Sequence, residues 1–429
     1  MIADLVADTY SRDDDGSVEK EGVYATVDAS MGVLRINLFK SERFMISVGD
    51  VFKNIMDWLS NPKIKMPMVW GINELGKPIY CDAYDMNTLI ISGVPRSGKS
   101  WKGQSFLIQL MMFLSPKEVN FHFFDPKGKQ SDYEYLSRVT PHSKSFTGDV
   151  HKIIPNIKKL IEREEPYRRK ILESHDMISI KDFKKKYPDE YMPYVYIVMD
   201  ELQTMMNSFS KEEKQEFNSL ISIICSQLPN LGFRLVMFPH RIVNDIINKN
   251  IYELVSCRCL VKTQTESALK SSLGVSKSEF PYALVMEGDM GIISPDINKG
   301  KASFCHSEVI TPSNSENREL FRYVGEVWKK LEPDYATGLY DSVVQSTTIS
   351  EKATGKTMDA YIDSIVGKKK SGSGGTTVSE PKDNSIGSEY QYTGYSSANT
   401  KEAVAEVDKA VEECISDLGD DEEDFWDTV

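Results

Sequence analysis

The chain has 429 residues, of which 40% are hydrophobic and 27% charged, enough for a large core with appendages. Its formal net charge of -13 argues at first against nucleic acid as a partner. Residues 341–429, however, hold 19 acidic and 8 basic residues, so the rest of the chain has a net charge of only -2, and the whole-chain charge does not exclude DNA.

Other bulk features exclude several classes of protein. No apolar run reaches the roughly 18 residues needed to cross a bilayer, and the N-terminus lacks the basic and apolar segments of a signal peptide. The six cysteines are scattered without a Cys-x-x-Cys pair, which predicts reduced thiols. We therefore expect a cytoplasmic protein (in the host cytoplasm if it is viral) with no transmembrane segment of its own.

The pattern of elements along the chain predicts three parts. Residues 1–65 predict a small N-terminal α/β module, with two short strands within 22–39 and a helix within 48–59. Residues 66–333 alternate apolar strands with helices such as Lys152–Glu173 and Lys211–Gln227, which is typical of a mostly parallel sheet covered on both faces. Residues 334–429 predict a flexible, low-complexity acidic tail. The predicted strands of the central part are Thr88–Ser92, Val119–Phe124, Tyr194–Met199, Phe233–Phe238 and Cys257–Lys262.

The strongest chemical pattern is Gly-Val-Pro-Arg-Ser-Gly-Lys-Ser at residues 93–100, which fits G-x-x-x-x-G-K-[ST] between a predicted strand and a predicted helix. Such a turn directs backbone N–H groups at phosphate oxygens, and the helix N-terminus adds its positive end. Lys99 is expected to reach the β- and γ-phosphates, and the Ser100 hydroxyl to coordinate Mg²⁺. The predicted nucleotide-binding residues are Gly93, Val94, Pro95, Arg96, Ser97, Gly98, Lys99, Ser100 and Trp101.

A second pattern is the pair Asp200-Glu201, which directly follows the predicted strand 194–199. A carboxylate at the C-terminal end of a parallel strand suits an Mg²⁺-linked Asp200. Glu201 can orient and deprotonate an attacking water, a task that a pure nucleotide-binding switch does not need. Solvated acids at an ordinary strand end are the alternative. Together with the phosphate loop, the pair predicts an NTP hydrolase.

A wider set of segments resembles the motor domains of FtsK/SpoIIIE-type DNA translocases, of the FtsK–HerA superfamily. The resemblance spans about residues 66–309 and keeps that family's order. It implies a RecA-like P-loop fold, ATP and Mg²⁺ as cofactors, a homo-oligomeric ring (hexamer or pentamer) and ATP-driven movement of a polymer. The segments that carry it are Gly71–Tyr80, the phosphate loop, Asp125-Pro126-Lys127, Asp200-Glu201-Leu202, Gly232–Val236 and Glu287–Met290.

The resemblance also implies roles for three further residues. Arg258 falls where such rings place an arginine that reaches the neighbouring subunit's nucleotide and stabilises transition-state charge; a solvated strand-start arginine is the alternative, and Arg241 is the second choice. His240 replaces the family's sensing Gln and would make that contact sensitive to protonation, or it is an ordinary surface or core histidine. The family's later Asp-Ser-Arg reads Glu266-Ser267-Ala268, so that arginine is absent unless Lys270 replaces it.

The moving substrate has one candidate contact, a predicted hairpin turn at Asp296–Lys301 that follows the predicted strand Gly291–Ser294. Lys299 and Lys301 can touch phosphates without reading bases, although solvated loop lysines are an equally good interpretation. The runs Lys184–Lys186 and Arg168-Arg169 are interspersed with acids, which predicts solvated faces.

The leading hypothesis is an ATPase that translocates double-stranded DNA, as a soluble single-motor form. The jobs considered are packaging of a viral genome, with a portal partner, or plasmid and mobile-element transfer, with a membrane partner. The alternative is a type VII-like secretion ATPase that moves polypeptide.

Overall fold

The computed structural model describes residues 23–30, 33–40, 46–242, 247, 249–263, 265–282, 284, 286–310 and 314–333. The predicted acidic tail therefore lies outside the described residues. The two strands expected near the N-terminus are present as an antiparallel hairpin of β1 (Val23–Ser30) and β2 (Val33–Lys40). The domain boundaries at 65/66 and 333/334 stay predictions.

One ten-stranded sheet organises the remaining described residues, in the order β4-β3-β12-β11-β10-β5-β9-β8-β6-β7. Six neighbouring strands, from β10 to β7, are parallel, which confirms the predicted mostly parallel sheet. Every residue of β5, β6, β8 and β9 is buried, as expected for a sheet covered on both faces. The six parallel strands are β5 (Thr88–Ser92), β6 (Val119–Phe124), β7 (Ser143–Thr147), β8 (Tyr194–Asp200), β9 (Phe233–Phe238) and β10 (Cys257–Val261).

Four antiparallel strands extend the sheet beyond β10. Of these, only the region of β11 was predicted as a strand, and its turn to β12 is the hairpin expected at 296–301. The turn contains a short 3-10 segment, η4 (Asn298–Gly300). The four strands are β3 (Pro67–Ile72), β4 (Pro78–Asp82), β11 (Asp289–Ile293) and β12 (Ser303–His306).

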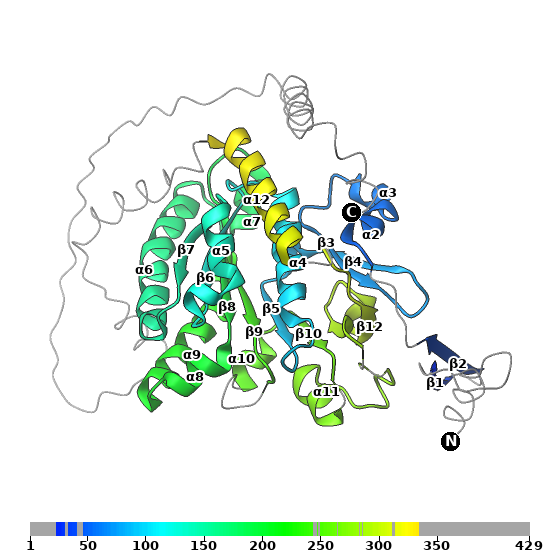
Figure 1. Ribbon diagram of the computed structural model, residues 1–429. Coiled ribbons are helices and arrows are strands. Elements are labelled where there is room, and N and C mark those ends of the chain that lie inside the picture. Colours follow the sequence, from blue (N-terminus) through cyan, green and yellow to red (C-terminus); the bar gives the residue numbers. More distant parts are fainter. Residues whose placement is uncertain are drawn as a thin grey trace, which may run out of the picture. The chain divides into compact units, whose positions relative to one another are not determined.

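Helices cover the sheet in two groups, because right-handed crossovers that run in opposite directions along a sheet lie on opposite faces. The connections from β5 to β6 and from β6 to β7 run one way along the sheet, and those from β7 to β8, from β8 to β9 and from β9 to β10 run the other way. Figure 1 shows the first group, in which α12 packs on α4 and α5; in the second, α9 packs on α6, α10 and β9. The first group is α4 (Lys99–Phe113), α5 (Asp132–Val139) and α12 (Asn314–Leu331); the second is α6 (Val150–Ser174), α9 (Lys211–Ser226) and α10 (Lys249–Glu253).

Short elements complete the described part. The predicted helix at 48–59 is interrupted, because Asn54 caps α2 and α3 starts two residues later. α2 packs on β3, and the N–H of Val48 donates to the carbonyl oxygen of Val309 at 3.1 Å. The short elements are α2 (Val48–Lys53), α3 (Met56–Leu59), η1 (Ala83–Asp85), η2 (Gly128–Gln130), α7 (Ile180–Lys186), α8 (Leu202–Ser208), η3 (Pro229–Leu231) and α11 (Glu266–Ser272).

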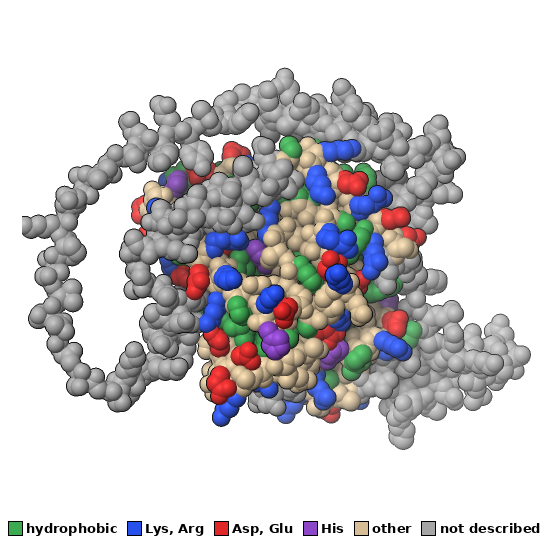
Figure 2. Space-filling view, turned by 60° about the vertical axis from the view of Figure 1, so that its left-hand side comes forward, with side chains coloured by type: hydrophobic (Ala, Val, Ile, Leu, Met, Phe, Trp, Pro, Cys, Tyr) green, Lys and Arg blue, Asp and Glu red, His purple; other side chains and the backbone are tan. Residues whose placement is uncertain are grey.

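The expectation of a solvated face was wrong for Arg168, which is fully buried on α6. Its Nε lies 3.0 Å from Oε2 of Glu164, while Nη1 and Nη2 donate to the carbonyl oxygens of Leu231 and Pro193. Because a buried charge must be paired and hydrogen-bonded, Arg168 fastens α6 to the loops that precede β8 and β9. Figure 2 shows one face of the molecule, on which basic and acidic side chains are interspersed.

The predicted reduced thiols agree with the structure for the five cysteines it describes. Cys81, Cys225, Cys257, Cys259 and Cys305 are all free and buried. No described helix is long and apolar enough to cross a membrane.

Candidate nucleotide site

The site lies where four parallel strands end side by side. The order β5-β9-β8-β6 brings the loops after these strands to one edge of the sheet, the edge formed by the C-terminal ends of the parallel strands. Register aligns Asp200 at the end of β8 with Phe238 at the end of β9, and Phe124 at the end of β6 with Met199. Residues more than a hundred positions apart in the chain thereby meet at the edge where α/β sheets bind their ligands.

The phosphate loop runs from the end of β5 into α4. Gly98 has a left-handed φ of 87° and directly precedes the first residue of the helix. A Cβ on Gly93 would lie 2.4 Å from Cγ2 of Val261, so only glycine fits there. Ser97 is buried, and its Oγ has no hydrogen-bond partner within the described part of the chain. These features match a loop built for close backbone approach to a ligand.

Lys99 opens α4 and is buried beneath the loop. Its Nζ donates to the carbonyl oxygen of Phe238 at 3.1 Å. Burial lowers its pKa, and the nearby carboxylates of Asp200 and Glu201 only partly oppose that effect. Burial removes hydration from this ammonium group. A bound phosphate would compensate for that loss with its negative charge, so Lys99 is well suited to bind one.

Asp200 and Glu201 share one cation, Lys127. The Nζ of Lys127 lies 3.0 Å from Oδ2 of Asp200 and 2.9 Å from Oε1 of Glu201. The other oxygen of Glu201, Oε2, lies 3.0 Å from Nε2 of His240. Because an ionised carboxylate only accepts, Nε2 carries the proton in this contact. Burial would raise the pKa of Glu201, but Lys127 and His240 outweigh it and hold that pKa below its ordinary value.

The backbone at Glu201 is itself unusual. Its φ of 51° and ψ of 45° put a non-glycine residue in the left-handed region, at the junction of β8 and α8. Gln203 supports the neighbouring loop, since its Oε1 accepts from the N–H of His240 at 2.9 Å and its Nε2 donates to the carbonyl oxygen of Arg241 at 3.2 Å. Backbone strain of this kind clusters at functional sites, where the surrounding structure enforces it.

Several buried polar atoms at this edge have no partner among the described residues. They include Oδ1 of Asp200, Oδ2 of Asp125, the hydroxyl of Tyr133 and Nδ1 of His240. Burial, and then Asp200, raises the pKa of Asp125. Buried polar groups are ordinarily satisfied, so this concentration of open donors and acceptors marks a place for a polar ligand.

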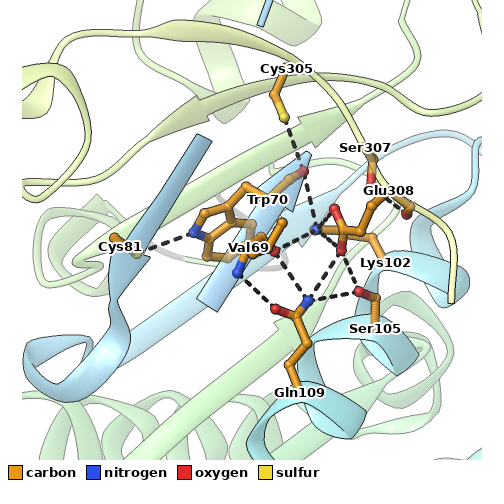
Figure 3. Close-up of polar contacts among 9 residues, drawn as sticks. All are labelled: Val69, Trp70, Cys81, Lys102, Ser105, Gln109, Cys305, Ser307 and Glu308. Carbon is orange, nitrogen blue, oxygen red and sulfur yellow. Dashed lines mark hydrogen bonds and ion pairs between the residues drawn. The ribbon is translucent and has the colours of Figure 1, made fainter. Parts of the chain in front are cut away.

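A buried network anchors the helix that follows the phosphate loop (Figure 3). Lys102, on the first turn of α4, forms an ion pair with both oxygens of Glu308, at 2.5 and 2.6 Å. Ser105 and Gln109, one and two turns further on, donate to Oε1 of the same carboxylate. Gln109 also exchanges two hydrogen bonds with the backbone of Val69 in β3. Sequence reasoning missed this network, because nothing local links residue 102 to residue 308.

The structure brings together Lys99, Asp200, Glu201 and His240 at this edge of the sheet. It places Arg258 elsewhere, near the start of β10 opposite Ile90, with its guanidinium over the ring of Tyr252 at 4.6 Å. Lys299 and Lys301 are exposed at the turn after β11, which runs antiparallel to β10 and so ends at the sheet edge opposite the phosphate loop.

The remaining predicted residues belong to loops around the site. Val94, Pro95, Arg96 and Arg241 are exposed. Ser100 and Trp101 are half-buried in the first turn of α4.

The main residue that sequence reasoning left without a role is Lys127. Its signal was visible as Asp125-Pro126-Lys127 after an apolar strand. Only the pairing of β6 with β8 shows that this lysine faces Asp200 and Glu201.

A RecA-like sheet with this loop and acid pair defines a P-loop ATPase. Residues 50–238 match the FtsK/SpoIIIE family, and this part of the chain is an ATPase domain of that family. The chain is 25% identical over 252 residues to DNA translocase FtsK of Chlorobaculum tepidum, covering 57% of this chain and 30% of the relative. It is 26% identical over 285 residues to that of Borreliella burgdorferi, covering 63% and 33%. The chain thus spans about a third of these relatives.

Solved structures share the fold. The cytoplasmic domain of the type VII secretion ATPase EccC from Thermomonospora curvata superposes with a TM-score of 0.53 at 17% identity, covering 66% of this chain and 34% of that one. The pCW3 conjugation coupling protein TcpA gives a TM-score of 0.52 at 17% identity, covering 70% and 82%. At these identities the likeness concerns the fold alone.

Proposed function

We propose that this protein uses ATP hydrolysis to translocate double-stranded DNA as a homo-oligomeric ring. The observation that carries the proposal is the family match over residues 50–238, together with relatives that are named DNA translocases. The work assigned to the ring is packaging of a viral genome or transfer of plasmid or mobile-element DNA, in concert with a portal or membrane partner.

The residues at the sheet edge fit Mg²⁺ and ATP. Ser100 Oγ and the open, buried Oδ1 of Asp200 are hard oxygen ligands of the kind Mg²⁺ prefers. Ser100 and Asp200 would hold the metal, which would supply positive charge to offset the negative charge that develops on the phosphates during transfer. Lys99 would turn from the Phe238 carbonyl to the β- and γ-phosphates, and Glu201 would accept the proton of the attacking water.

The exposed turn of Lys299 and Lys301 fits a contact with the DNA backbone. Lysines on a short loop bind phosphates without reading sequence, which suits continuous tracking. The turn lies at the other edge of the sheet from the phosphate loop, so hydrolysis and DNA contact would occupy opposite ends of β11.

The test compares ATP turnover with and without linear duplex DNA. We expect DNA to raise turnover severalfold, and Glu201→Gln to bind ATP without turning it over. Stimulation by an unfolded polypeptide and none by DNA would instead favour a secretion ATPase. Turnover that responds to neither polymer would overturn translocation of both.

A second measurement addresses the turn. The double variant Lys299→Ala/Lys301→Ala should lower the slope of log Kd for DNA against log salt by about two, because each phosphate contact contributes roughly 0.9. Lys329→Ala/Lys330→Ala, two exposed lysines at the end of α12, is the matched control. Equal slopes for the two double variants would remove the turn from the DNA contact.

A further inference from the structure

We propose that Lys127 is a positioning residue for hydrolysis, whose ammonium group ties Asp200 to Glu201 and keeps the metal-holding and water-activating carboxylates in fixed relation. The inference rests on the proposed roles of those two acids. It concerns basal turnover and does not depend on DNA.

The loop that carries Lys127 is built to hold its backbone still. The N–H of Lys127 donates to Oδ1 of buried Asp125 at 3.0 Å, and the N–H of Gly128 donates to the Asp125 carbonyl oxygen at 3.1 Å. Gly128 has a φ of 59°, and a Cβ on Gly148 would lie 2.8 Å from its Cα. The turn after β6 is therefore closely packed, and the lysine stem starts from a defined position.

The contacts of Lys127 Nζ use one oxygen of each carboxylate and leave one oxygen of Asp200 for a metal ion. Lys127 takes Oδ2 of Asp200 and Oε1 of Glu201, at 3.0 and 2.9 Å. Oδ1 of Asp200, which is buried, stays open for the metal. Lys127 and Mg²⁺ can thus occupy the same acid pair without competing for one oxygen.

Charge explains why the acid pair needs this cation. Two adjacent carboxylates bridged by a single ammonium are close enough to repel each other strongly at an interior dielectric. Asp200 is held in the sheet with a side chain only 3% exposed, whereas the Glu201 side chain is 17% exposed. Without Lys127, repulsion would therefore move Glu201, and His240 alone would hold it.

The same charge should work against the metal. An ammonium 3.0 Å from Asp200 lowers the attraction of that carboxylate for a dication. Replacing Lys127 by an uncharged side chain of similar length therefore has two effects of opposite sign. Mg²⁺ should bind more tightly, while hydrolysis becomes slower. Loss of fold would weaken both.

The experiment measures both effects in the full chain with Lys127→Met. Binding of a fluorescent, non-hydrolysable ATP analogue is titrated with Mg²⁺, and the half-saturating Mg²⁺ concentration should fall on the order of fivefold. In steady-state assays without DNA, kcat should fall at least tenfold, with KM for ATP changing less than threefold. Lys127→Arg keeps the charge, so it should retain the wild-type Mg²⁺ requirement and recover part of kcat.

Lys129→Met is the matched control, because Lys129 is exposed two residues further along the same loop. It should leave both measurements unchanged. A Lys127→Met protein with wild-type kcat, or with a raised Mg²⁺ requirement, would overturn the inference. Wild-type turnover in Glu201→Gln would instead overturn the assignment of the base, so the two failures are distinguishable.

Discussion

His142 is a fully buried residue whose titration should affect the stability of this protein. Its ring lies 5.9 Å from that of Phe121 and 6.0 Å from that of Trp328, and Nε2 is 2.8 Å from the carbonyl oxygen of Leu114. Burial lowers the pKa of His142 to about 3. His122, also buried, has its pKa lowered well below the ordinary value by the same cause.

The sign of the pH effect follows from these directions. A histidine in the unfolded chain gains a proton below about pH 6.5, while His142 in the folded chain stays neutral until about pH 3. The unfolded state therefore binds more protons in this window, and stability falls as the pH falls. Between pH 7.5 and 5, His142 alone should account for about 2 kcal/mol of lost unfolding free energy.

Urea unfolding at the two pH values checks this prediction. His142→Gln should be less stable than the wild type at pH 7.5, because packing is lost, but should lose less stability on acidification. His151→Gln, at an exposed position of α6, should keep the wild-type pH response. Equal acid losses in His142→Gln and the wild type would contradict the prediction.

At the scale of single residues, the sequence predicted those whose chemistry is written in a local pattern. Lys99 and Asp200-Glu201 lie beside strands or helices that are themselves recognisable, so their positions at the C-terminal ends of the parallel strands could be expected. Lys127 acquires its role only from the pairing of β6 with β8, and Arg168 is buried only because α6 packs over the loops before β8 and β9. Such contacts between distant segments have no local signature.

The element most dependent on one buried contact is α4, held by the Lys102–Glu308 ion pair. Lys102→Met would leave the Glu308 carboxylate buried without its cation, which should cost about 3–5 kcal/mol of unfolding free energy. Adding Glu308→Gln should recover part of that loss, because a neutral amide can still accept from Ser105 and Gln109.

Urea unfolding of both single variants and the double variant tests the coupling between the two side chains. The double variant should be more stable than Lys102→Met alone. Lys53→Met removes an exposed pair with Asp50 and should change stability by less than about 0.5 kcal/mol. Strictly additive losses at Lys102 and Glu308 would show that the network is not a unit.

The elements that the sequence predicted most closely are the central strands of the parallel part of the sheet. The central parallel strands are continuous apolar runs, so their positions were expected within about a residue. β7 reads Ser-Lys-Ser-Phe-Thr, with one apolar residue. It is the last strand in the sheet order, so it has a neighbouring strand on one side only and is less buried than the central strands. β3, β4 and β12 gain their places through antiparallel pairing with distant segments, which periodicity alone does not indicate.

At the scale of the whole molecule, the proposed ring would complete each catalytic site with a residue from a neighbouring chain. Within the described residues, Lys99 and Lys127 supply positive charge near Asp200 and Glu201, and His240 forms a hydrogen bond with Glu201. Arg258 instead stacks on Tyr252, away from its own phosphate loop. If the chain assembles as a ring, the family resemblance predicts that this guanidinium reaches a neighbour's nucleotide.

Mixing two inactive variants tests this arrangement. Lys99→Met lacks the phosphate lysine and Arg258→Ala lacks the proposed trans-acting arginine, so each should turn over ATP at least a hundredfold more slowly than the wild type. In mixed assemblies, an Arg258→Ala subunit can hydrolyse ATP when its neighbour is Lys99→Met, which still carries Arg258, so activity should return on mixing. Lys99→Met mixed with Glu201→Gln is the control. Lys99 and Glu201 act within one chain, so an arginine from a neighbour cannot repair either site, and this mixture should stay inactive. Co-assembly confirmed by light scattering without recovery of turnover would exclude Arg258 as the residue acting between subunits, and the same mixture with Arg241→Ala would then test the second candidate.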